Sequence, residues 1–461
     1  MNDYDTIAAI STTLGESGIA IIRISGNNAR NVIKNIFRDK KGNRINEFNH
    51  YTFKHGYIHE IETNDALDEV LVSFMKSPNS FTGEDTIEIN CHGGFLAVQK
   101  TLEEVIKSGA RIAEPGEFTK RAFLNGRIDL SQAEAVIDII NSKTVNSIKS
   151  SINQSKGNLS IIVNELRDNI LNLIANIAAV VDYPEEDMED VTAMNSIDKI
   201  MDIFNRINKL IISYEDGKII KDGIKAVIVG KPNVGKSSLL NNILKENRAI
   251  VTDVPGTTRD IIEEYVNIGG ILLKIIDTAG IRKTEDLVEK IGVEKTKEKV
   301  KEADLVIFMV DASRELDNED EEILSYLQDG EKKYIVLLNK SDLPNKIDNF
   351  ELKGVNKENI INISAKSGLG VDLINDKIKD LFFKGDVSSS NYVINNLRHK
   401  ESLLKTKEAL EAALESLKNV GDIDLASIDL KNAYFRLGEI TGDTLEDDII
   451  DKIFSKFCLG K

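Results

Sequence analysis

The sequence lacks the features that secreted and membrane proteins need. It holds only two cysteines, Cys91 and Cys458, which are too few for a disulfide framework and fit a reducing compartment. Its longest apolar stretch, residues 170–181, is interrupted by asparagines and is about a dozen residues long, whereas a membrane-spanning helix needs about 20. The chain does not open on a basic segment followed by an apolar one, as a signal peptide would. We therefore expect a soluble protein of the cytoplasm.

Basic residues are too few to balance the acidic ones. The chain has 59 lysines and arginines against 76 aspartates and glutamates, which gives a net charge of −17. Because an acidic surface repels a phosphate backbone, this balance argues against non-specific binding of nucleic acid. Any contact with nucleic acid must use a local basic patch or a partner protein.

Residue types that bind zinc do not occur at zinc spacing. His50, His55 and His59 lie close together, but only His55 and His59 share a face at strand period. No cysteine or carboxylate stands where a zinc site would need it, so we interpret these residues as surface histidines.

The hydrophobic patterning predicts three domains, as does the length at about 150 residues per domain. Residues 1–117 alternate short β-rich runs with helical patterns, which indicates an α+β domain. Residues 222–383 alternate strands with helices, as a doubly wound parallel sheet does. Residues 118–221 and 384–461 have helical spacing, including one continuous pattern over 130–152. Neither helical block can enclose a core alone, so we expect both to form one all-α helical bundle domain, with the α/β unit inserted into it.

The stretch Gly230-Lys231-Pro232-Asn233-Val234-Gly235-Lys236-Ser237 predicts a nucleotide site. It matches G-x-x-x-x-G-K-S between the apolar run 224–229 and a helical pattern over 238–244, the context that a P-loop requires. Backbone N–H groups and a helix N-terminus would surround the phosphates. Lys236 would reach the β and γ phosphates, and Ser237 would ligate Mg²⁺. The residues expected to contact nucleotide here are Asn233, Val234, Gly235, Lys236, Ser237 and Ser238.

Three further motifs follow at successive strand ends, where ligands bind in such sheets. Asp277-Thr278-Ala279-Gly280 matches D-x-x-G, whose aspartate supports Mg²⁺ and whose glycine N–H senses a γ-phosphate. Asn339-Lys340-Ser341-Asp342 matches N-K-x-D, in which Asp342 would accept from the N1–H and amine of guanine, a donor pair that adenine lacks. Ser364-Ala365-Lys366 fits the accompanying base loop. Together the motifs predict a Ras-like GTPase domain.

The second switch region lacks the glutamine that orients water in Ras-like proteins. Ile281 stands at that position. Glu285, Asp286 and Glu289 are acidic candidates to replace it, and a solvated charge run is the alternative.

Asn233 indicates that a bound cation, in place of an arginine finger, neutralises the charge that develops on the phosphates. Its amide oxygen and carbonyls of the loop Thr252–Arg259 would ligate a monovalent cation beside the phosphates. Thr258 in the same loop is the natural second ligand of Mg²⁺. The alternative is that Asn233 is only a turn residue.

These motifs carry a family resemblance. The P-loop and the segment Thr252–Asp260 resemble potassium-dependent GTPases that dimerise through their G domains. Over its whole length the chain resembles the MnmE (TrmE) family of tRNA modification GTPases. That family usually ends in Phe-Cys-Ile-Gly-Lys, so Leu459 is a mild departure. The segments that carry this resemblance are Ile22-Arg23-Ile24-Ser25-Gly26, Ser80-Phe81-Thr82-Gly83-Glu84-Asp85, Pro115-Gly116-Glu117-Phe118, Arg121-Ala122-Phe123-Leu124-Asn125-Gly126 and Phe457-Cys458-Leu459-Gly460-Lys461.

The resemblance implies a ligand for the N-terminal domain. This domain would dimerise the protein and hold a tetrahydrofolate one-carbon derivative, 5-formyl or 5,10-methylene. The family often has lysine where Arg127 stands, so the charge persists while the geometry differs. The implied folate contacts are Arg23, Glu84, Arg127 and Lys461.

The resemblance also assigns roles within the GTPase domain. Lys236 and Glu289 would be catalytic, with Glu289 orienting the attacking water. The implied potassium ligands are Asn233, Thr252, Val254 and Thr257, and the implied Mg²⁺ ligands are Ser237 and Thr258. The remaining GTP contacts would be Asp253, Pro255, Gly256, Asp277, Thr278, Ala279, Gly280, Asn339, Lys340, Asp342, Ser364, Ala365 and Lys366.

The implied partner is the flavoprotein MnmG (GidA), with which a homodimer of this chain would form a heterotetramer. Together they would install an aminomethyl-type group, carboxymethylaminomethyl, at carbon-5 of the wobble uridine of certain tRNAs. MnmG would bind most of the tRNA, which agrees with the acidic balance. Cys458 is either a nucleophile near the folate carbon or a small buried hydrophobe.

Two other readings compete. A GTP-dependent switch in ribosome assembly would share all the GTPase motifs, but such proteins usually carry a basic RNA-binding module in place of this N-terminal domain. A structural dimer scaffold with vestigial hydrolysis is the other, and the intact Lys236, Ser237, Thr258 and Asp277 argue against it.

Overall fold

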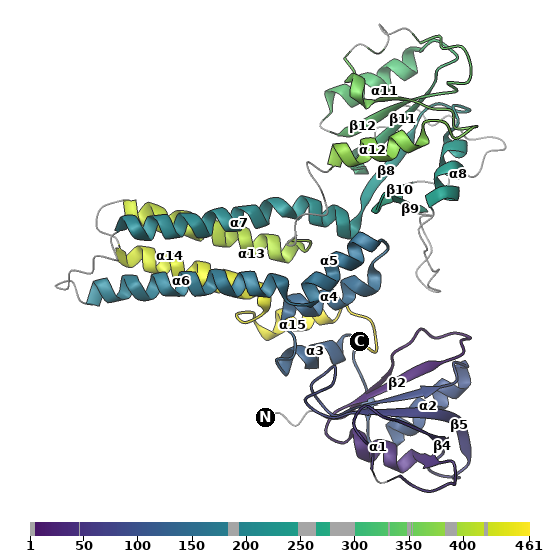
Figure 1. The fold of residues 1–461 in the computed structure, drawn as a ribbon, viewed down its shortest axis with the longest axis vertical. Coiled ribbons are helices and arrows are strands. Elements are labelled where there is room, and N and C mark those ends of the chain that lie inside the picture. The colour runs from purple at the N-terminus through teal and green to yellow at the C-terminus, as the bar shows by residue number, and fades with distance from the viewer. Residues whose placement is uncertain are drawn as a thin grey trace. The chain divides into compact units, whose positions relative to one another are not determined.

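The computed structural model describes residues 5–45, 47–182, 193–247, 264–276, 300–330, 332–347, 352, 354–382, 394–418 and 423–461. It divides into two compact units. The first comprises Met1–Ile137, Gln154–Ile200 and Glu408–Lys461, and the second comprises Asp138–Asn153 and Met201–Lys407 (Figure 1).

The first unit contains a 7-stranded sheet in the order β3-β4-β5-β6-β2-β1-β7. All neighbours are antiparallel except β1 and β7, which are parallel. The short strands β3 and β7 leave no alternating pattern in the sequence. The strands are β1 (Ile7–Ile10), β2 (Ala20–Ser25), β3 (Phe37–Asp39), β4 (Phe53–His59), β5 (Ala66–Met75), β6 (Thr86–Cys91) and β7 (Arg111–Ile112).

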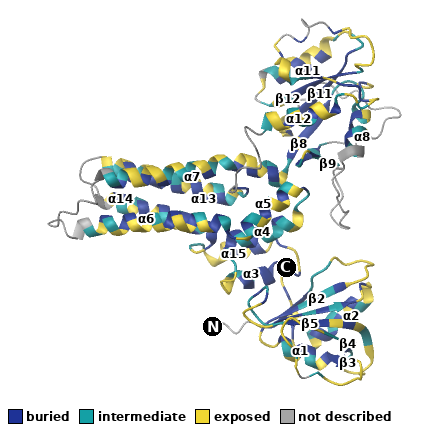
Figure 2. Ribbon diagram, viewed as in Figure 1, coloured by how far each residue is buried: buried dark blue, intermediate teal, exposed yellow. Residues whose placement is uncertain are grey.

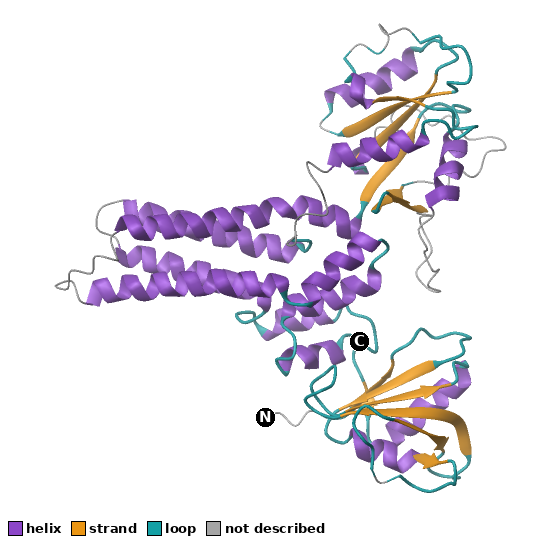
Figure 3. Cartoon of the chain, viewed as in Figure 1, coloured by secondary structure: helices purple, strands orange, loops and turns teal. Residues whose placement is uncertain are grey.

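Two helices pack on this sheet. Helix α1 (Ala29–Ile36) contacts β6 and β3, and α2 (Phe95–Lys107) contacts β1, β2 and β5. The core between them is aliphatic and includes Ile24, Ile33 and Val72, all fully buried. Figure 3 shows this α+β arrangement, which confirms the prediction for the N-terminal domain.

The helices of the first unit come from two segments of the chain, one before and one after the residues of the 6-stranded sheet. Helix α6 (Asn158–Asp182) packs along α14 (Ile423–Thr441), so a helix before the inserted unit pairs with one after it. Helix α15 (Asp447–Phe454) packs on α3 (Glu117–Leu124). This confirms the expectation that the two helical blocks need each other to bury their apolar faces.

The continuous helix predicted over residues 130–152 is wrong, because the chain breaks after Asn141. Helix α4 spans Leu130–Asn141 and α5 spans Val145–Ser155. The Ser142 hydroxyl donates to the Asp138 carbonyl at 2.6 Å. The Thr144 hydroxyl accepts from the Ser147 N–H at 3.1 Å and caps α5. Hydroxyl side chains that bond to nearby backbone end one helix and start the next.

The second unit contains a 6-stranded sheet in the order β13-β12-β11-β8-β10-β9. Five strands are parallel, as predicted, but β9 pairs antiparallel with β10 at the edge. Gly269 and Gly270 join these two strands with φ of 59° and 90°, a tight hairpin turn that needs glycine. The strands are β8 (Ile224–Val229), β9 (Glu264–Ile268), β10 (Ile271–Ile275), β11 (Leu305–Asp311), β12 (Lys333–Asn339) and β13 (Ile360–Asn362).

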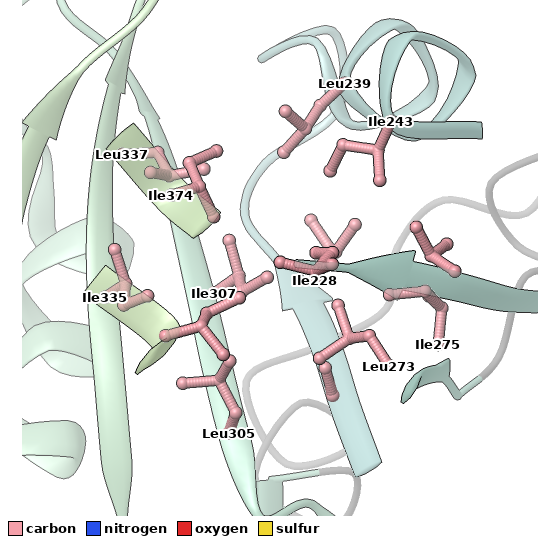
Figure 4. Packing of buried hydrophobic residues seen from close by; sticks show 14 of the residues in the cluster. Ile228, Leu239, Ile243, Leu273, Ile275, Leu305, Ile307, Ile335, Leu337 and Ile374 are labelled. Carbon is pink, nitrogen blue, oxygen red and sulfur yellow. The ribbon is translucent and has the colours of Figure 1, made fainter. Parts of the chain in front are cut away.

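Both faces of this sheet are covered, which explains why its central strands are apolar throughout. On β11, Ile307 belongs to one core and Phe308 to the other, since successive side chains alternate. Helices α8 (Lys236–Asn247) and α12 (Val371–Phe382) cover the first face, and α11 (Asn318–Asp329) covers the second. Figure 4 shows the first core, and Figure 2 shows β8, β11 and β12 buried beneath these helices.

Two long helices complete the second unit. Most of α7 (Ala193–Asp222) and the first turns of α13 (Leu397–Lys418) belong to it. They are joined by bonds from Lys400 to Glu215 at 2.9 Å and from Lys407 to Asn208 at 3.3 Å. Among the described helices, none has the length and apolarity that a membrane crossing demands.

Candidate functional site

The P-loop lies between β8 and α8, where the sequence placed it. Gly230 and Gly235 adopt φ of 148° and 107°. A Cβ on Gly230 would lie 2.3 Å from the Met309 carbonyl oxygen, so only glycine fits against β11. Asn233 has φ of 63°, a left-handed conformation that asparagine tolerates better than most residues. The loop thus has the close backbone turns that a phosphate-binding loop needs.

The Lys236 ammonium group lies over the loop. Its Nζ donates to the carbonyls of Gly230 and Lys231, both at 2.8 Å. These bonds hold the cation at the N-terminus of α8, where phosphates of a nucleotide would meet it.

Asn339 at the end of β12 joins the P-loop to the base loop. Its Nδ2 donates to the Val234 carbonyl at 2.6 Å, and its Oδ1 accepts from the Ala365 N–H at 2.8 Å. Its side chain is 3% exposed. A Cβ on Gly235 would lie 2.3 Å from Nδ2 of Asn339. The role of Asn339 in this structure is therefore to hold two loops together, and its amide does not face outward for a base.

The carboxylate of Asp342, which the sequence predicts to read the base, is exposed and favours the ionised form. The Ser364 hydroxyl hydrogen-bonds to Asp342 and, together with Lys366 and Lys340 nearby, lowers the pKa of that carboxyl below its usual value. The Ser341 N–H donates to the Ile363 carbonyl at 3.0 Å and so ties this motif to the loop after β13. An ionised acceptor at this position is what recognition of guanine's two donors requires.

Lys340, in the same motif, connects the end of β12 to the end of β11. Its φ is 66°, and its Nζ bonds to Oδ2 of Asp311 at 2.5 Å. Burial of Asp311 opposes ionisation, but the bonds from Lys340 and Ser313 outweigh it and lower the pKa of this carboxyl.

Sequence reasoning missed Lys231 and Asp317. Lys231 pairs with Asp317 and lies 3.4 Å from Glu319 and 3.7 Å from Asp320. Asp317 caps α11 by accepting from the Glu319 and Asp320 N–H groups. The sequence signal that could have identified Asp317 is the capping pattern that it forms with Asp320. The pair with Lys231 then connects the P-loop to the start of α11.

Several predicted site residues lie outside the described residues, and their roles stay predictions. Strand β10 ends at Ile275, and the Ile276 N–H donates to the Ala226 carbonyl at 2.8 Å, directly before the D-x-x-G motif in the sequence. Within the described part of the chain, no group of three histidine, cysteine or acidic side chains could hold a metal ion. The residues outside are Thr252, Asp253, Val254, Pro255, Gly256, Thr257, Thr258, Asp277, Thr278, Ala279, Gly280, Ile281, Glu285, Asp286 and Glu289.

A second cluster lies in the first unit, where Arg23 on β2 meets the end of the chain. Arg23 donates to Oε1 of Glu88, its cross-strand neighbour, from Nε at 3.0 Å and Nη2 at 2.8 Å. Its Nη1 lies 3.4 Å from the Gly460 carbonyl oxygen. Residues far apart in sequence thus share one site.

An aromatic ring lies between the cationic side chains of this cluster. The guanidinium groups of Arg23 and Arg127 lie 5.6 Å and 5.4 Å from the centroid of the Phe81 ring. Arg23 also lies 5.7 Å from the Phe118 ring. Rings within about 6 Å of a cation attract it and hold it in place. Phe81 and Phe118 stand inside the motifs that carried the family resemblance, yet the sequence alone gave no reason to choose them.

The C-terminal residues are seated by glycine. Gly460 has φ of 84°, and its carbonyl accepts from the Ser11 hydroxyl at 3.1 Å. A Cβ there would lie 2.4 Å from the Ile10 carbonyl oxygen. Burial and the nearby Arg23 lower the pKa of Lys461, because both disfavour a second cation. Three cationic side chains with one carboxylate, Glu88, form a cluster suited to an anionic ligand.

Glu84 lies beside this cluster in a buried ionic network. It accepts from the Ser25 hydroxyl at 2.7 Å and from Nη1 of Arg121 at 3.2 Å. Ser25 and Arg23 share a face of β2, since they are two residues apart. Arg121 is 2% exposed and also bonds to Asp5 and Glu117. The structure thus places Glu84 next to the predicted site, where its carboxylate forms an ion pair with Arg121.

The interpretation of Cys458 as a small buried hydrophobe is wrong, because its side chain is exposed. Its carbonyl accepts from the Gly116 N–H at 3.3 Å, and the neighbouring Phe457 fills the buried position. The terminal pentapeptide is therefore anchored by Phe457 and Gly460 and presents the thiol to solvent.

Comparisons with known proteins cover nearly the whole chain. Residues 130–458 match the MnmE helical domain, and residues 6–127 match the GTP-binding protein TrmE N-terminus. The tRNA modification GTPase MnmE of Thermoanaerobacter pseudethanolicus (strain ATCC 33223 / 39E) is 52% identical over 460 residues, with 99% of this chain and 100% of that protein covered. The tRNA modification GTPase MnmE of Clostridioides difficile (strain 630) is 52% identical over 459 residues, with 99% of each covered.

Among solved structures, the G domain of the T. maritima FeoB iron transporter is 26% identical. The match covers 34% of this chain and 97% of that chain with a TM-score of 0.25.

Proposed function

This chain belongs to the MnmE family of tRNA modification GTPases, and from that membership we propose that it is a potassium-stimulated GTP hydrolase that takes part in the modification of wobble uridine. With the flavoprotein MnmG, it would add an aminomethyl-type group at carbon-5 of that base, using a tetrahydrofolate one-carbon unit. The observation that carries the proposal is the position of Gly460 and Lys461 beside Arg23, because it would complete a cationic ligand site in the same chain as the predicted guanine nucleotide site.

The nucleotide site supports GTP hydrolysis. Lys236 lies at the N-terminus of α8, and Ser237 follows it where a Mg²⁺ ligand belongs. The ionised Asp342 supports selection of guanine over adenine. When bound, Mg²⁺ supplies charge neutralisation at the β and γ phosphates.

Potassium would be held by Asn233, Thr252, Val254 and Thr257. The left-handed backbone of Asn233 fits either a cation ligand or a turn, so the support here is the residue type and its position in the loop. Glu289 would hold the attacking water, since Ile281 offers no acceptor.

The N-terminal cluster fits a folate. Arg23, Arg127 and Lys461 would face the ligand's carboxylates, and Glu84, held by Arg121 and Ser25, would accept from the donors of the pterin ring. The bound folate supplies the one-carbon unit, and the chain's own residues bind and orient it. The exposed Cys458 is close in sequence to this cluster, and we assign it no step.

Dimerisation through the N-terminal domain, a heterotetramer with MnmG, and tRNA binding mainly by MnmG complete the proposal. The net charge of −17 supports the last point. The ribosome-assembly alternative leaves the cationic N-terminal cluster without a ligand.

Mass analysis of wobble-uridine nucleosides from cells lacking this protein tests the proposal. We expect the aminomethyl-type modification to disappear and to return with the wild-type gene, but not with Lys236→Ala. Unchanged nucleosides in the deletion strain, together with a defect in ribosomal subunits, would favour the assembly alternative.

A further inference from the structure

A turn in the first unit is rich in exposed basic residues, and neither ligand site uses it. Residues 34–44 contain Lys34, Arg38, Lys40, Lys41 and Arg44 against the single acid Asp39. Lys40, Lys41 and Arg44 are exposed. We call Arg38–Arg44 the basic turn. In a chain of net charge −17, such a concentration of positive charge is an exception.

The one acid of the basic turn is occupied by the backbone. Oδ1 of Asp39 accepts from the N–H groups of Lys41 and Asn43, both at 2.8 Å, and Oδ2 accepts from Nδ2 of Asn43 at 3.2 Å. These bonds lower the pKa of Asp39 and fix the turn. The carboxylate therefore shapes the loop, and no ion pair between it and Lys40, Lys41 or Arg44 occurs in the described structure.

Like charges are held together here at a cost. Arg38 and Arg44 face each other in an antiparallel bridge, and like charges directly opposite destabilise a strand pair. Arg38 is buried, and its Nη1 donates to the carbonyls of Asn35 at 3.0 Å and Phe37 at 2.9 Å. Burial, and to a smaller extent the nearby Arg44, lower the pKa of Arg38.

The tip of the turn is open to a large partner. Gly42 has φ of 80°, and a Cβ there would meet nothing within 4 Å. The turn follows β3, the edge strand of the sheet. Lysines at an edge strand also prevent aggregation, but that role does not call for two arginines placed opposite each other.

We propose that the basic turn binds the phosphate backbone of RNA. Lys40, Lys41 and Arg44 project from one ordered turn and match the charge of phosphates, which dominate nucleic-acid affinity. RNA fits better than an anionic membrane, because residues 40–44 include no apolar side chain to insert among lipids. The inference rests on the proposed tRNA function and gives this chain its own small share of the tRNA contact.

The test compares full-length wild-type chain with Lys40→Gln/Lys41→Gln/Arg44→Gln, using a labelled, unmodified tRNA transcript across a salt series. We expect the triple variant to bind at least about tenfold more weakly at low salt. The slope of log affinity against log salt should fall by about 2 to 3, at about 0.7 to 0.9 per phosphate contact. The matched control, Lys76→Gln/Lys156→Gln/Lys452→Gln, removes the same charge from exposed positions of the same unit and should keep the wild-type slope.

Stability distinguishes function from edge protection. Because the basic turn holds repelling charges, the triple variant should unfold at the same temperature as wild type or higher, without aggregating. An unchanged salt slope, a slope equally reduced in the control, or loss of binding to phosphatidylglycerol vesicles in place of RNA would each overturn the inference. Failure of the wider proposal is separate, since it shows in the wobble nucleosides of the deletion strain.

Discussion

At the scale of single residues, Asn339 illustrates how a motif residue acts. N-K-x-D is usually interpreted as a base-recognition motif, yet both polar atoms of the Asn339 amide form hydrogen bonds within the protein, to Val234 and Ala365. Its effect on nucleotide is therefore indirect. It sets the distance between the loop that would hold phosphates and the loop that would hold the base.

Asn339→Ala should weaken GTP binding by tenfold or more. The substitution leaves the Val234 carbonyl and the Ala365 N–H without their partner, at a cost of about 1 to 3 kcal/mol for a buried group. Asn242→Ala removes one bond to the Ala365 carbonyl and should be milder. Titration with a fluorescent GTP analogue measures both, and equal affinity for wild type and Asn339→Ala would contradict the bridging role.

Asn233→Ala should abolish the preference for potassium over sodium in hydrolysis. Ion size sets the fit to fixed oxygen ligands, so wild type should hydrolyse GTP much faster in potassium. Nucleotide binding should persist in the variant, because Lys236 and the loop backbone remain. Equal wild-type rates in the two salts would show that Asn233 is only the turn residue that its φ of 63° allows.

Glu289→Ala should lower the hydrolysis rate by about 10²-fold or more, the usual loss for a positioned proton acceptor. GTP affinity should not change, because the phosphates and base are held elsewhere. Single-turnover hydrolysis in potassium measures the effect, with Glu285→Ala and Asp286→Ala as controls. If either control is more damaging, the water is oriented by that residue instead.

At the scale of elements, the final residues 457–461 lie against the cationic cluster around Arg23 in the N-terminal domain. Phe457 packs with Phe454 and Leu130, and Gly460 closes on Ser11 and Ile10. A short tail is thus ordered by one apolar anchor and one glycine turn.

Deleting Gly460 and Lys461 should weaken tetrahydrofolate binding while leaving basal GTP hydrolysis nearly unchanged. The deletion removes a cation and the carbonyl beside Arg23. Isothermal titration measures folate affinity, and Lys461→Gln separates the side chain's charge from the tail's backbone. Undiminished affinity in the deletion would place the folate elsewhere.

The sequence predicted helices and strands well where the apolar pattern is long, and poorly where side-chain hydrogen bonds to nearby backbone decide where a helix ends. Strand β8 coincides with the apolar run 224–229 of the sequence, because the apolar residues are nearly unbroken there. The break between α4 and α5 depends on the hydroxyls of Ser142 and Thr144, which do not interrupt an apolar pattern. Arg23 and Lys461 came from motif resemblance, whereas Glu88 and Phe81 became visible only when cross-strand register and side-chain direction were known.

At the scale of the whole molecule, a partly buried ionic network joins distant parts of the first unit. Arg121 on α3 binds Asp5, Glu84 and Glu117, and Arg111 binds Asp5 and Glu117. Burial of Glu117 opposes its ionisation, but bonds from Arg111, the Glu114 N–H and Arg121 outweigh it, so its pKa lies below the ordinary 4.5.

Glu117→Gln should flatten the acid side of the stability profile. A lowered pKa in the folded state gives stability that is present above the ordinary value and is lost as pH falls through the folded value. Wild type should therefore lose unfolding free energy steeply below about pH 4.5, and the variant less steeply. Near neutral pH the variant should be less stable by roughly 1 to 3 kcal/mol. Thermal unfolding followed by circular dichroism across this range measures both, and parallel profiles would contradict the role of Glu117.

The pairing of α6 with α14 has a consequence for biosynthesis. Helix α6 ends at Asp182 and α14 begins at Ile423, so roughly 240 residues must be translated between them, which takes about 12 to 50 seconds at 5 to 20 residues per second. During that interval the nascent α6 emerges from the ribosome before the helix that covers its apolar stripe has been made. The helix must wait for a partner synthesised near the end of the chain, and chaperones that shield apolar nascent segments would act on it in that window.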